Sequence, residues 1–199
     1  NNQLTGSIPD LSPLTHLTNI NLSVNHLTGT LPAGLGALSA LALLILSANC
    51  LSQTLPESLG SLSALQVLEV GINSLTGPVP PLGAALTLLD LAANSLSGTL
   101  PALLSSPLLE MVFLSQALFT GQLPAAHCSL SALTSYDVDT NLLTGSVPSC
   151  LFTALTALFV LQIDSNQLTG QLPPFGNLLA LESFHCFDNH FTGTVPTTI

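Results

Sequence analysis

Leucine and other large apolar residues recur along the chain at a fixed spacing from one asparagine. From the second occurrence onward the spacing is apolar-x-x-apolar-x-apolar-x-x-Asn, as in Leu17, Ile20, Leu22 and Asn25. The alternation at its centre is the pattern of a short strand with one buried face. The anchor positions of the successive units are Asn2, Asn25, Asn49, Asn73, Asn94, Ala117, Asn141, Asn166 and Asn189. This period of 21 to 25 residues predicts a single solenoid of about eight repeats over residues 1–199, with strands stacked in parallel.

Each unit continues with a phrase such as LTGTLP at residues 27–32. The anchor Asn leaves the strand where backbone groups face inward, and its amide has the donors and acceptor to pair with them. The Gly suits a left-handed turn, and the Pro stands where no ladder donor is needed. Ala117 replaces the Asn once and Gln53 replaces the Gly once. We therefore expect one gap in the amide ladder and one locally altered turn.

The combined pattern LxxLxLxxNxLTGxIPxxLGxLxxL resembles the plant-type subclass of leucine-rich repeats (LRRs), found in receptor-kinase ectodomains, receptor-like proteins and polygalacturonase inhibitors. Residues 59–79, LGSLSALQVLEVGINSLTGPV, are a nearly complete instance. The resemblance implies an α/β-type repeat solenoid: a right-handed superhelix with a concave parallel β-sheet, a second short strand near LTG, and 3₁₀ or irregular convex turns. It also implies an extracellular or cell-surface location. The cysteine-paired caps usual in the family are absent at both ends, so we expect a fragment lacking both caps.

Composition changes this picture in two respects. The chain is 47% hydrophobic with a mean hydropathy of +0.64, but its longest apolar run, residues 35–46, is shorter than the roughly 18 residues that a membrane helix needs. The chain has ten Asp plus Glu and no Lys or Arg, so its net charge is −10. An average chain of this length carries about 25 basic residues, so their absence is either a property of the source or a result of how the sequence was assigned. Nucleic-acid binding is excluded because phosphate contacts depend on Lys and Arg.

The residues flanking the inner apolar positions of each strand are expected to point out of the concave sheet. In the central units they are apolar, and contiguous exposed apolar surface usually marks an interface. A covering loop or glycan is the alternative explanation. The predicted concave-face binding residues are Leu43, Ile45, Val67, Glu69, Leu88, Asp90, Met111, Phe113, Asp137, Asp139, Asp164 and His185.

Carboxylates concentrate on the strand segments, which hold eight of the ten. Asp139 and Asp164 occupy equivalent places one coil apart, so we expect them about 5 Å from each other, with Asp137 two residues along the strand. Like charges this close raise at least one pKa or attract a cation. Clustered carboxylates suit calcium, although no dense DxDxDG run is present. The three residues are therefore a candidate calcium site, and a solvated acidic rim or a docking face for a basic ligand is the alternative. No other cofactor is expected.

The remaining motifs indicate an extracellular protein without catalysis. There is no nucleophile elbow, metal-spaced His pair or phosphate loop, so we expect no enzyme activity. Cys128 and Cys150 lie just after the Pro of adjacent units, and a disulfide between these loops would fit an oxidising compartment. Cys50 and Cys186 are expected to be buried thiols. The single N-glycosylation sequon begins at Asn21.

Three functions remain open. The leading hypothesis is a non-catalytic extracellular recognition module that binds a protein, peptide or glycan on its concave face, without membrane insertion in this segment. The alternative is a structural subunit of a wall, sheath or fibre, whose ends stack on further subunits. The third is ice binding, because the phrase carries Thr or Ser in every unit, although the repeat pattern already requires that column for turn hydrogen bonds. The column consists of Thr5, Thr28, Ser52, Thr76, Ser97, Thr120, Thr144, Thr169 and Thr192.

Overall fold

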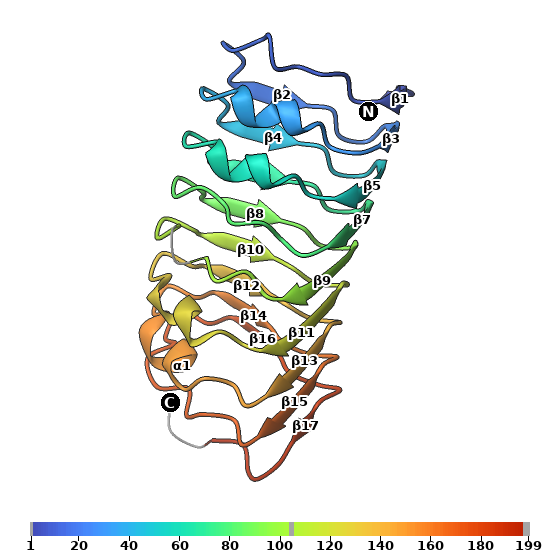
Figure 1. Cartoon of the computed structure of the whole chain (residues 1–199). Coiled ribbons are helices and arrows are strands. Elements are labelled where there is room, and N and C mark those ends of the chain that lie inside the picture. Colours follow the sequence, from blue (N-terminus) through green and yellow to red (C-terminus); the bar gives the residue numbers. More distant parts are fainter. Residues whose placement is uncertain (1, 104–105, 197–199) are drawn as a thin grey trace.

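Residues 2–103 and 106–196 are described by the structure, a computed structural model. Their backbone winds into a solenoid with two parallel sheets along its length (Figure 1). The eight-stranded sheet contains β2 (Asn19–Asn21), β4 (Leu43–Ile45), β6 (Val67–Glu69), β8 (Leu88–Asp90), β10 (Met111–Phe113), β12 (Ser135–Asp137), β14 (Val160–Gln162) and β16 (Ser183–His185). The nine-stranded sheet contains β1 (Thr5–Ser7), β3 (His26–Gly29), β5 (Cys50–Thr54), β7 (Ser74–Gly77), β9 (Ser95–Thr99), β11 (Leu118–Gln122), β13 (Leu142–Gly145), β15 (Gln167–Gly170) and β17 (His190–Phe191).

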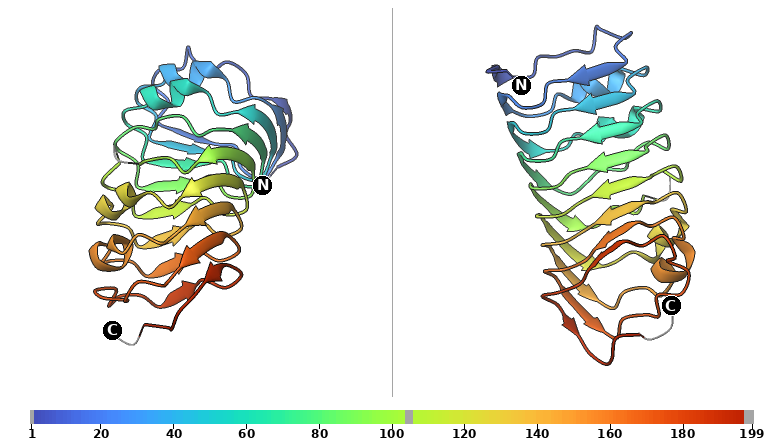
Figure 2. Two further views of the ribbon diagram at one scale, coloured as in Figure 1. Left: turned by 60° about the horizontal axis from the view of Figure 1, so that its bottom comes forward. Right: turned by 180° about the vertical axis from the view of Figure 1, so that it is seen from behind.

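The eight-stranded sheet is the concave sheet expected from the repeat, and the nine-stranded sheet is made by the LTG phrases (Figure 2). Short helices lie between the two sheets along the chain and form part of the convex side. They are the 3₁₀ helices η1 (Ala33–Ala37), η2 (Glu57–Ser61) and η3 (Ala125–Ser129) and the α-helix α1 (Cys150–Ala154). None of the helices in the described part of the chain is long and apolar enough to cross a bilayer.

The core fills the inside of each coil with the repeated apolar positions. Leu44 and Leu46 of one coil and Leu68 of the next have no exposed surface. Each such side chain contributes about 1.5–3 kcal/mol by leaving water. Because the neighbouring coils supply the contacts, the core is continuous along the solenoid and no coil is stable alone.

The anchor asparagines form the predicted amide ladder. Asn141 is typical: its Oδ1 accepts from the Phe119 amide of the preceding coil at 3.0 Å, and its Nδ2 donates to the carbonyls of Leu114, Val138 and Asp139. The same set of bonds is formed by Asn49, Asn73, Asn94, Asn166 and Asn189. Asn25 forms it without the bond to a carbonyl of the preceding coil. Ala117 has no such amide, so the ladder is interrupted once, as the sequence predicts.

A residue in the left-handed conformation precedes every anchor position from the second unit onward. Their φ angles lie between 48° and 56°, and none of them is glycine. They are Val24, Ala48, Ile72, Ala93, Gln116, Thr140, Ser165 and Asp188. The sequence does not reveal that this position needs a left-handed backbone, because apolar, polar and acidic residues all occupy it.

Ile72 is one of three β-branched residues in this set, with Val24 and Thr140, and such side chains clash with the backbone in the left-handed region. Its side chain is 62% exposed, so it contributes little packing in compensation. We expect Ile72→Gly to raise the free energy of unfolding by about 1 kcal/mol. Chemical denaturation would measure this, with Ala93→Gly as a control that should gain less. A loss of stability in Ile72→Gly would contradict the strain.

The turn at Gln53 is not altered, contrary to the expectation from the sequence. Its φ is 69°, close to the 76° of Gly77 in the next coil. Neighbouring coils hold the chain on both sides through β5, which pairs with β3 and β7. The sheet therefore imposes the left-handed turn on a residue that does not favour it.

Candidate ligand-binding face

Strand pairing brings the predicted concave-face residues into two rows. In the first row Leu43, Val67, Leu88 and Met111 stand beside one another on β4, β6, β8 and β10. In the second row, two residues along each strand, the members are Ile45, Glu69, Asp90, Phe113, Asp137, Gln162 and His185. Every member of the two rows except His185 is half-buried, and the residue between the rows is buried. The side chains therefore line the outer face of the eight-stranded sheet. Figure 2 (right) shows the strands of this sheet.

We call the apolar members of these rows the apolar patch: Leu43, Ile45, Val67, Leu88, Met111 and Phe113. The patch extends over four neighbouring strands, from β4 to β10. Its surface remains accessible to a partner, since each side chain is only half-buried.

Aspartates at the strand ends stabilise the local backbone. Asp90 accepts a hydrogen bond from the amide of Ala92 at 3.0 Å, and Asp137 accepts one from the amide of Asp139 at 3.1 Å. Asn21 accepts in the same way from the Ser23 amide. A side chain that bonds the amide two residues on stabilises the bend after the strand. This explains Asp or Asn at these positions without a ligand.

We call Asp137, Asp139 and Asp164 the acidic group. Asp164 is only 4% exposed, and its Oδ1 has no hydrogen-bond partner. The Oδ1 of Asp139 is likewise buried without a donor. Burial, more than the neighbouring charges of Asp137 and Asp164, raises the pKa of Asp139. Burial also raises the pKa of Asp137, against the hydrogen bonds from Asp139 and Ser115.

The acidic group does not assemble as a metal centre. Among the described residues, no three His, Cys, Asp or Glu side chains are placed so that they hold a metal ion together. The three-carboxylate calcium site expected from the sequence is therefore not formed: Asp137 directs its carboxylate to the Asp139 amide and Ser115, and Asp164 is buried.

His185 lies at the end of the second row and is exposed. Its Nδ1 accepts a hydrogen bond from the side-chain amide of Gln162 at 3.1 Å. His185 interacts with the acidic group electrostatically. It acts to lower the pKa of Asp139, whereas the larger effect of burial raises that pKa. No nucleophile accompanies it in these contacts.

Comparisons with known proteins agree with this geometry. A family model described as Leucine Rich Repeat matches residues 16–38 and 85–107. Receptor-like protein 35 of Arabidopsis thaliana is 37% identical over 95 residues, which cover 47% of this chain. The structure superposes on the crystal structure of PEPR1–AtPEP1 with a TM-score of 0.93, 33% identity and 98% of the chain covered. It also superposes on the Arabidopsis receptor kinase HAESA, solved with the peptide hormone IDA and the co-receptor SERK1, with a TM-score of 0.92, 30% identity and 98% covered.

The chain is a plant-type leucine-rich-repeat protein. It is related to receptor-like proteins and to the ectodomains of LRR receptor kinases. The LRR chain spans 10% of the length of Receptor-like protein 35, and 28% and 34% of the PEPR1 and HAESA chains. A plant ice-binding protein has the same fold, with a TM-score of 0.80 and 26% identity, covering 100% of this chain and 73% of that one.

The convex side of the LRR chain contains the predicted disulfide. Cys128 of η3 and Cys150 of α1 are joined, with their Cα atoms 5.6 Å apart. The bond links two neighbouring coils. The expectation for the other cysteines was wrong: Cys50 is exposed in β5, and Cys186 is only half-buried. Cys50 occupies the outward position of a strand, and Cys186 has no following coil in the described residues to cover it.

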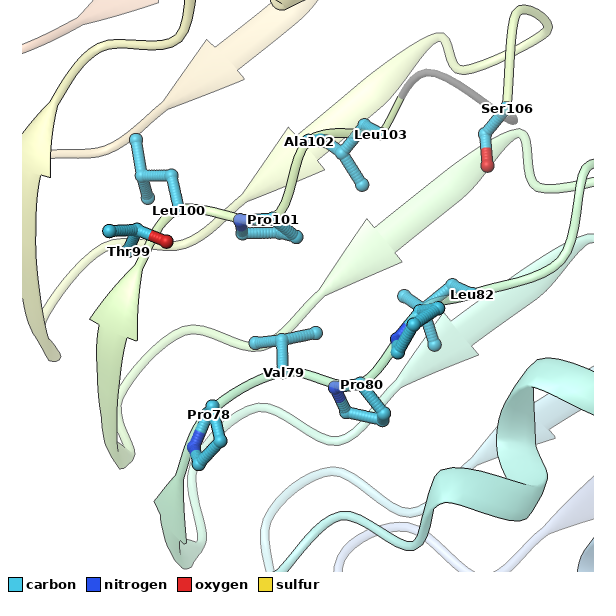
Figure 3. A pocket seen from close by; sticks show the side chains of 11 residues that line it. Pro78, Val79, Pro80, Leu82, Thr99, Leu100, Pro101, Ala102, Leu103 and Ser106 are labelled. Carbon is cyan, nitrogen blue, oxygen red and sulfur yellow. The ribbon is translucent and has the colours of Figure 1, made fainter.

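A pocket of about 460 Å³ on the convex side was not predicted from the sequence (Figure 3). It lies between two coils whose described residues form no helix at this point, and prolines such as Pro78, Pro80 and Pro101 line it. The sequence contained an indication: the unit from Asn73 to Asn94 is the shortest and contains the run PVPPLG. The lining residues carry no charge, so the pocket offers no catalytic chemistry.

The buried aspartates predict an unusual pH dependence for the LRR chain. A carboxyl whose pKa is raised in the folded state contributes stability below its unfolded pKa and loses it as the pH rises through the folded pKa. Burial raises the pKa of both Asp90 and Asp137, so these groups should make the protein less stable at neutral pH than at mildly acidic pH.

We expect Asp137→Asn to raise the melting temperature at pH 7 and to flatten its decline above pH 4. The amide oxygen still accepts from the Asp139 amide, and the amide nitrogen donates to the Ser115 hydroxyl, so both contacts are retained without the charge. Thermal melts between pH 3 and pH 8 would measure this. Asp10→Asn is the control: a hydrogen bond from Ser12 lowers the pKa of the exposed Asp10, so neutralising it should bring no gain. An equal gain in both variants would indicate general charge repulsion instead.

Proposed function

We propose that the LRR chain is a non-catalytic extracellular recognition module that binds a peptide or a protein segment on its eight-stranded face. The observation that carries the proposal is the apolar patch, six half-exposed side chains in register on four adjacent strands. Apolar surface of this extent is costly to leave in water and usually marks an interface. The relatives support it, because two of the similar structures are receptor complexes with AtPEP1 and the peptide hormone IDA.

A disulfide on the convex side supports an extracellular location, since such bonds persist in oxidising compartments. Asn21 is exposed at the start of its sequon, so a glycan there would be accessible to solvent. The catalytic alternative has no support in the site geometry: Asp90 and Asp137 accept hydrogen bonds from backbone amides at the bends, and no nucleophile contacts His185 in the described hydrogen bonds.

Selection of binders from a random phage-displayed peptide library tests the proposal, followed by affinity measurement on variants. Met111→Asp places a charge in the apolar patch, on its last strand β10, and should weaken binding of the selected peptides by about tenfold or more. Leu179→Asp is the matched control, because Leu179 is 82% exposed and lies outside the patch. Unchanged affinity in a folded Met111→Asp variant would refute the concave-face site.

Light scattering on the free protein tests the fibre alternative, which requires assembly that increases with concentration.

A second candidate is ice binding on the nine-stranded sheet. Its strands contain no Asp or Glu, and the LTG position of the strands from β1 to β15 carries Thr or Ser, beside other outward residues such as His26, Cys50 and Leu118. Thr120 and Thr144 donate their hydroxyl hydrogens to the carbonyls of Gly98 and Gly121, so their methyl groups belong to an exposed array of Thr and Ser side chains. The array is staggered, because the register places Thr120 beside Leu142 and Thr144 beside Gln167. The similarity to a plant ice-binding protein supports this candidate.

Thermal hysteresis of the purified protein tests ice binding directly. If it is present, Thr120→Glu should abolish it, because a charge in the middle of the array binds water in another arrangement, whereas Met111→Asp should leave it unchanged. Absence of hysteresis in the unmodified protein would rule out this function.

A further inference from the structure

The apolar patch and the acidic group are adjacent parts of one face. Phe113 of the patch pairs in register with Asp137 of the acidic group, on neighbouring strands β10 and β12. Asp139 and Asp164 follow β12 and β14, so the acidic group lies towards the C-terminal coils and the patch towards the N-terminal coils. A ligand that lies along the face across successive coils therefore contacts the apolar patch with one part and the acidic group with the next.

The acidic group lacks the counter-charge that such groups usually have. The chain contains no Lys or Arg, and its net charge is −10. The titratable groups that affect the two half-buried members are Asp90, Asp164 and His185, and of these only His185 offers a positive charge. It is exposed and already bonded to Gln162. Cationic groups for these carboxylates must therefore come from another molecule.

A second observation indicates that hydrogen-bond donors are missing. Asp164 is 96% buried, and the Oδ1 atoms of Asp164 and Asp139 have no donor in the protein. A buried carboxylate oxygen without a donor destabilises the folded protein, because its lost hydration is not replaced. Asp139 is only half-buried, so it opens this pair of carboxylates towards the face. A guanidinium or ammonium group supplies both the missing charge and several donors.

We propose that the partner of the concave face is an extended peptide segment with two parts, an apolar part on β4 to β10 and an Arg or Lys that lies over the acidic group. This inference rests on the proposed function and adds the chemistry and direction of the ligand. The centre of the patch lies about three coils from the centre of the acidic group, or about 14 Å. An extended chain covers this distance in about four to five residues, which sets the separation of the apolar and basic residues.

The selected peptides test this inference in two steps. Sequencing should show enrichment of Arg or Lys at a constant separation from a large apolar residue. Replacing that Arg by citrulline, its neutral analogue, should weaken binding about tenfold, because a charge-assisted hydrogen bond is lost. The double variant Asp137→Asn/Asp139→Asn should weaken binding of the Arg peptide by a similar factor and leave the affinity for the citrulline peptide unchanged.

Control variants separate local from general electrostatics. Asp10→Asn and Glu57→Gln remove carboxylates outside the concave face and should leave both affinities unchanged. Equal binding of the Arg and citrulline peptides, with loss of binding in Met111→Asp, would overturn the cationic ligand and leave the proposed function standing. If no peptide is enriched over background, both proposals fail. Thermal melts of each variant confirm that it is folded.

Discussion

Asn141→Ala is expected to lower the free energy of unfolding by about 3 kcal/mol, which is a large fraction of the total stability of a typical domain. The substitution removes four hydrogen bonds, and it leaves the buried amide of Phe119 without an acceptor. Alanine cannot replace these bonds, and the core around the position excludes water. Urea denaturation would measure the loss.

Two further variants test whether the ladder is the cause. Asn177→Ala removes an exposed Asn that bonds only the Thr153 carbonyl, and it should change stability by less than about 0.5 kcal/mol. Ala117→Asn fills the one gap in the ladder and should add about 1 kcal/mol. If Asn141→Ala is no more damaging than Asn177→Ala, the ladder does not stabilise the stack.

His127→Leu is expected to cost about 2–4 kcal/mol, although it replaces a polar residue by an apolar one in the core. The imidazole of His127 has no exposed surface and lies 2.7 Å from both the Tyr136 hydroxyl and the Pro101 carbonyl oxygen. A carbonyl only accepts, so Nε2 carries the hydrogen and Nδ1 accepts from Tyr136. Burial raises the pKa of Tyr136 far above its ordinary range, so the phenol remains a donor. Leucine would leave both partners buried and unpaired.

The same substitution should remove a pH effect. Burial lowers the pKa of His127 below its ordinary value of 6.5, against the opposing effect of the Pro101 bond. The unfolded chain therefore binds the proton more readily, and the contribution of His127 to stability is lost as the pH falls below about 6.5. Between pH 7.5 and pH 5.5 the stability of His127→Leu should rise more, or fall less, than that of the unmodified protein. His26→Leu, at an exposed position, is the control, and an unchanged slope in His127→Leu would argue against the neutral buried imidazole.

The repeat pattern contains a clue to His127 that only becomes clear beside the structure. Leu35, Leu59 and Leu151 each stand three residues after the Pro of their coil and are buried, and His127 occupies the same place. A histidine at a core leucine position needs two partners, and Tyr136 is nine residues away while Pro101 belongs to the preceding coil. Sequence periodicity predicts the burial but not the partners.

The sequence alone determined the solenoid, the first strand of each coil, the amide ladder with its gap at Ala117 and the rows of the concave face. It made Cys128 and Cys150 a candidate disulfide, and the second strand of each coil was implied by the family resemblance. These features depend on periodicity, because a regular spacing fixes which residues of successive coils stand side by side. Only the tertiary structure decided what each side chain does there. In the folded chain Asp90 and Asp137 accept hydrogen bonds at the bends, and Asp164 is buried. The expected calcium ligands do not come together, and a pocket forms on the convex side. These outcomes depend on rotamers and on burial by neighbouring coils, which a spacing in the sequence does not contain.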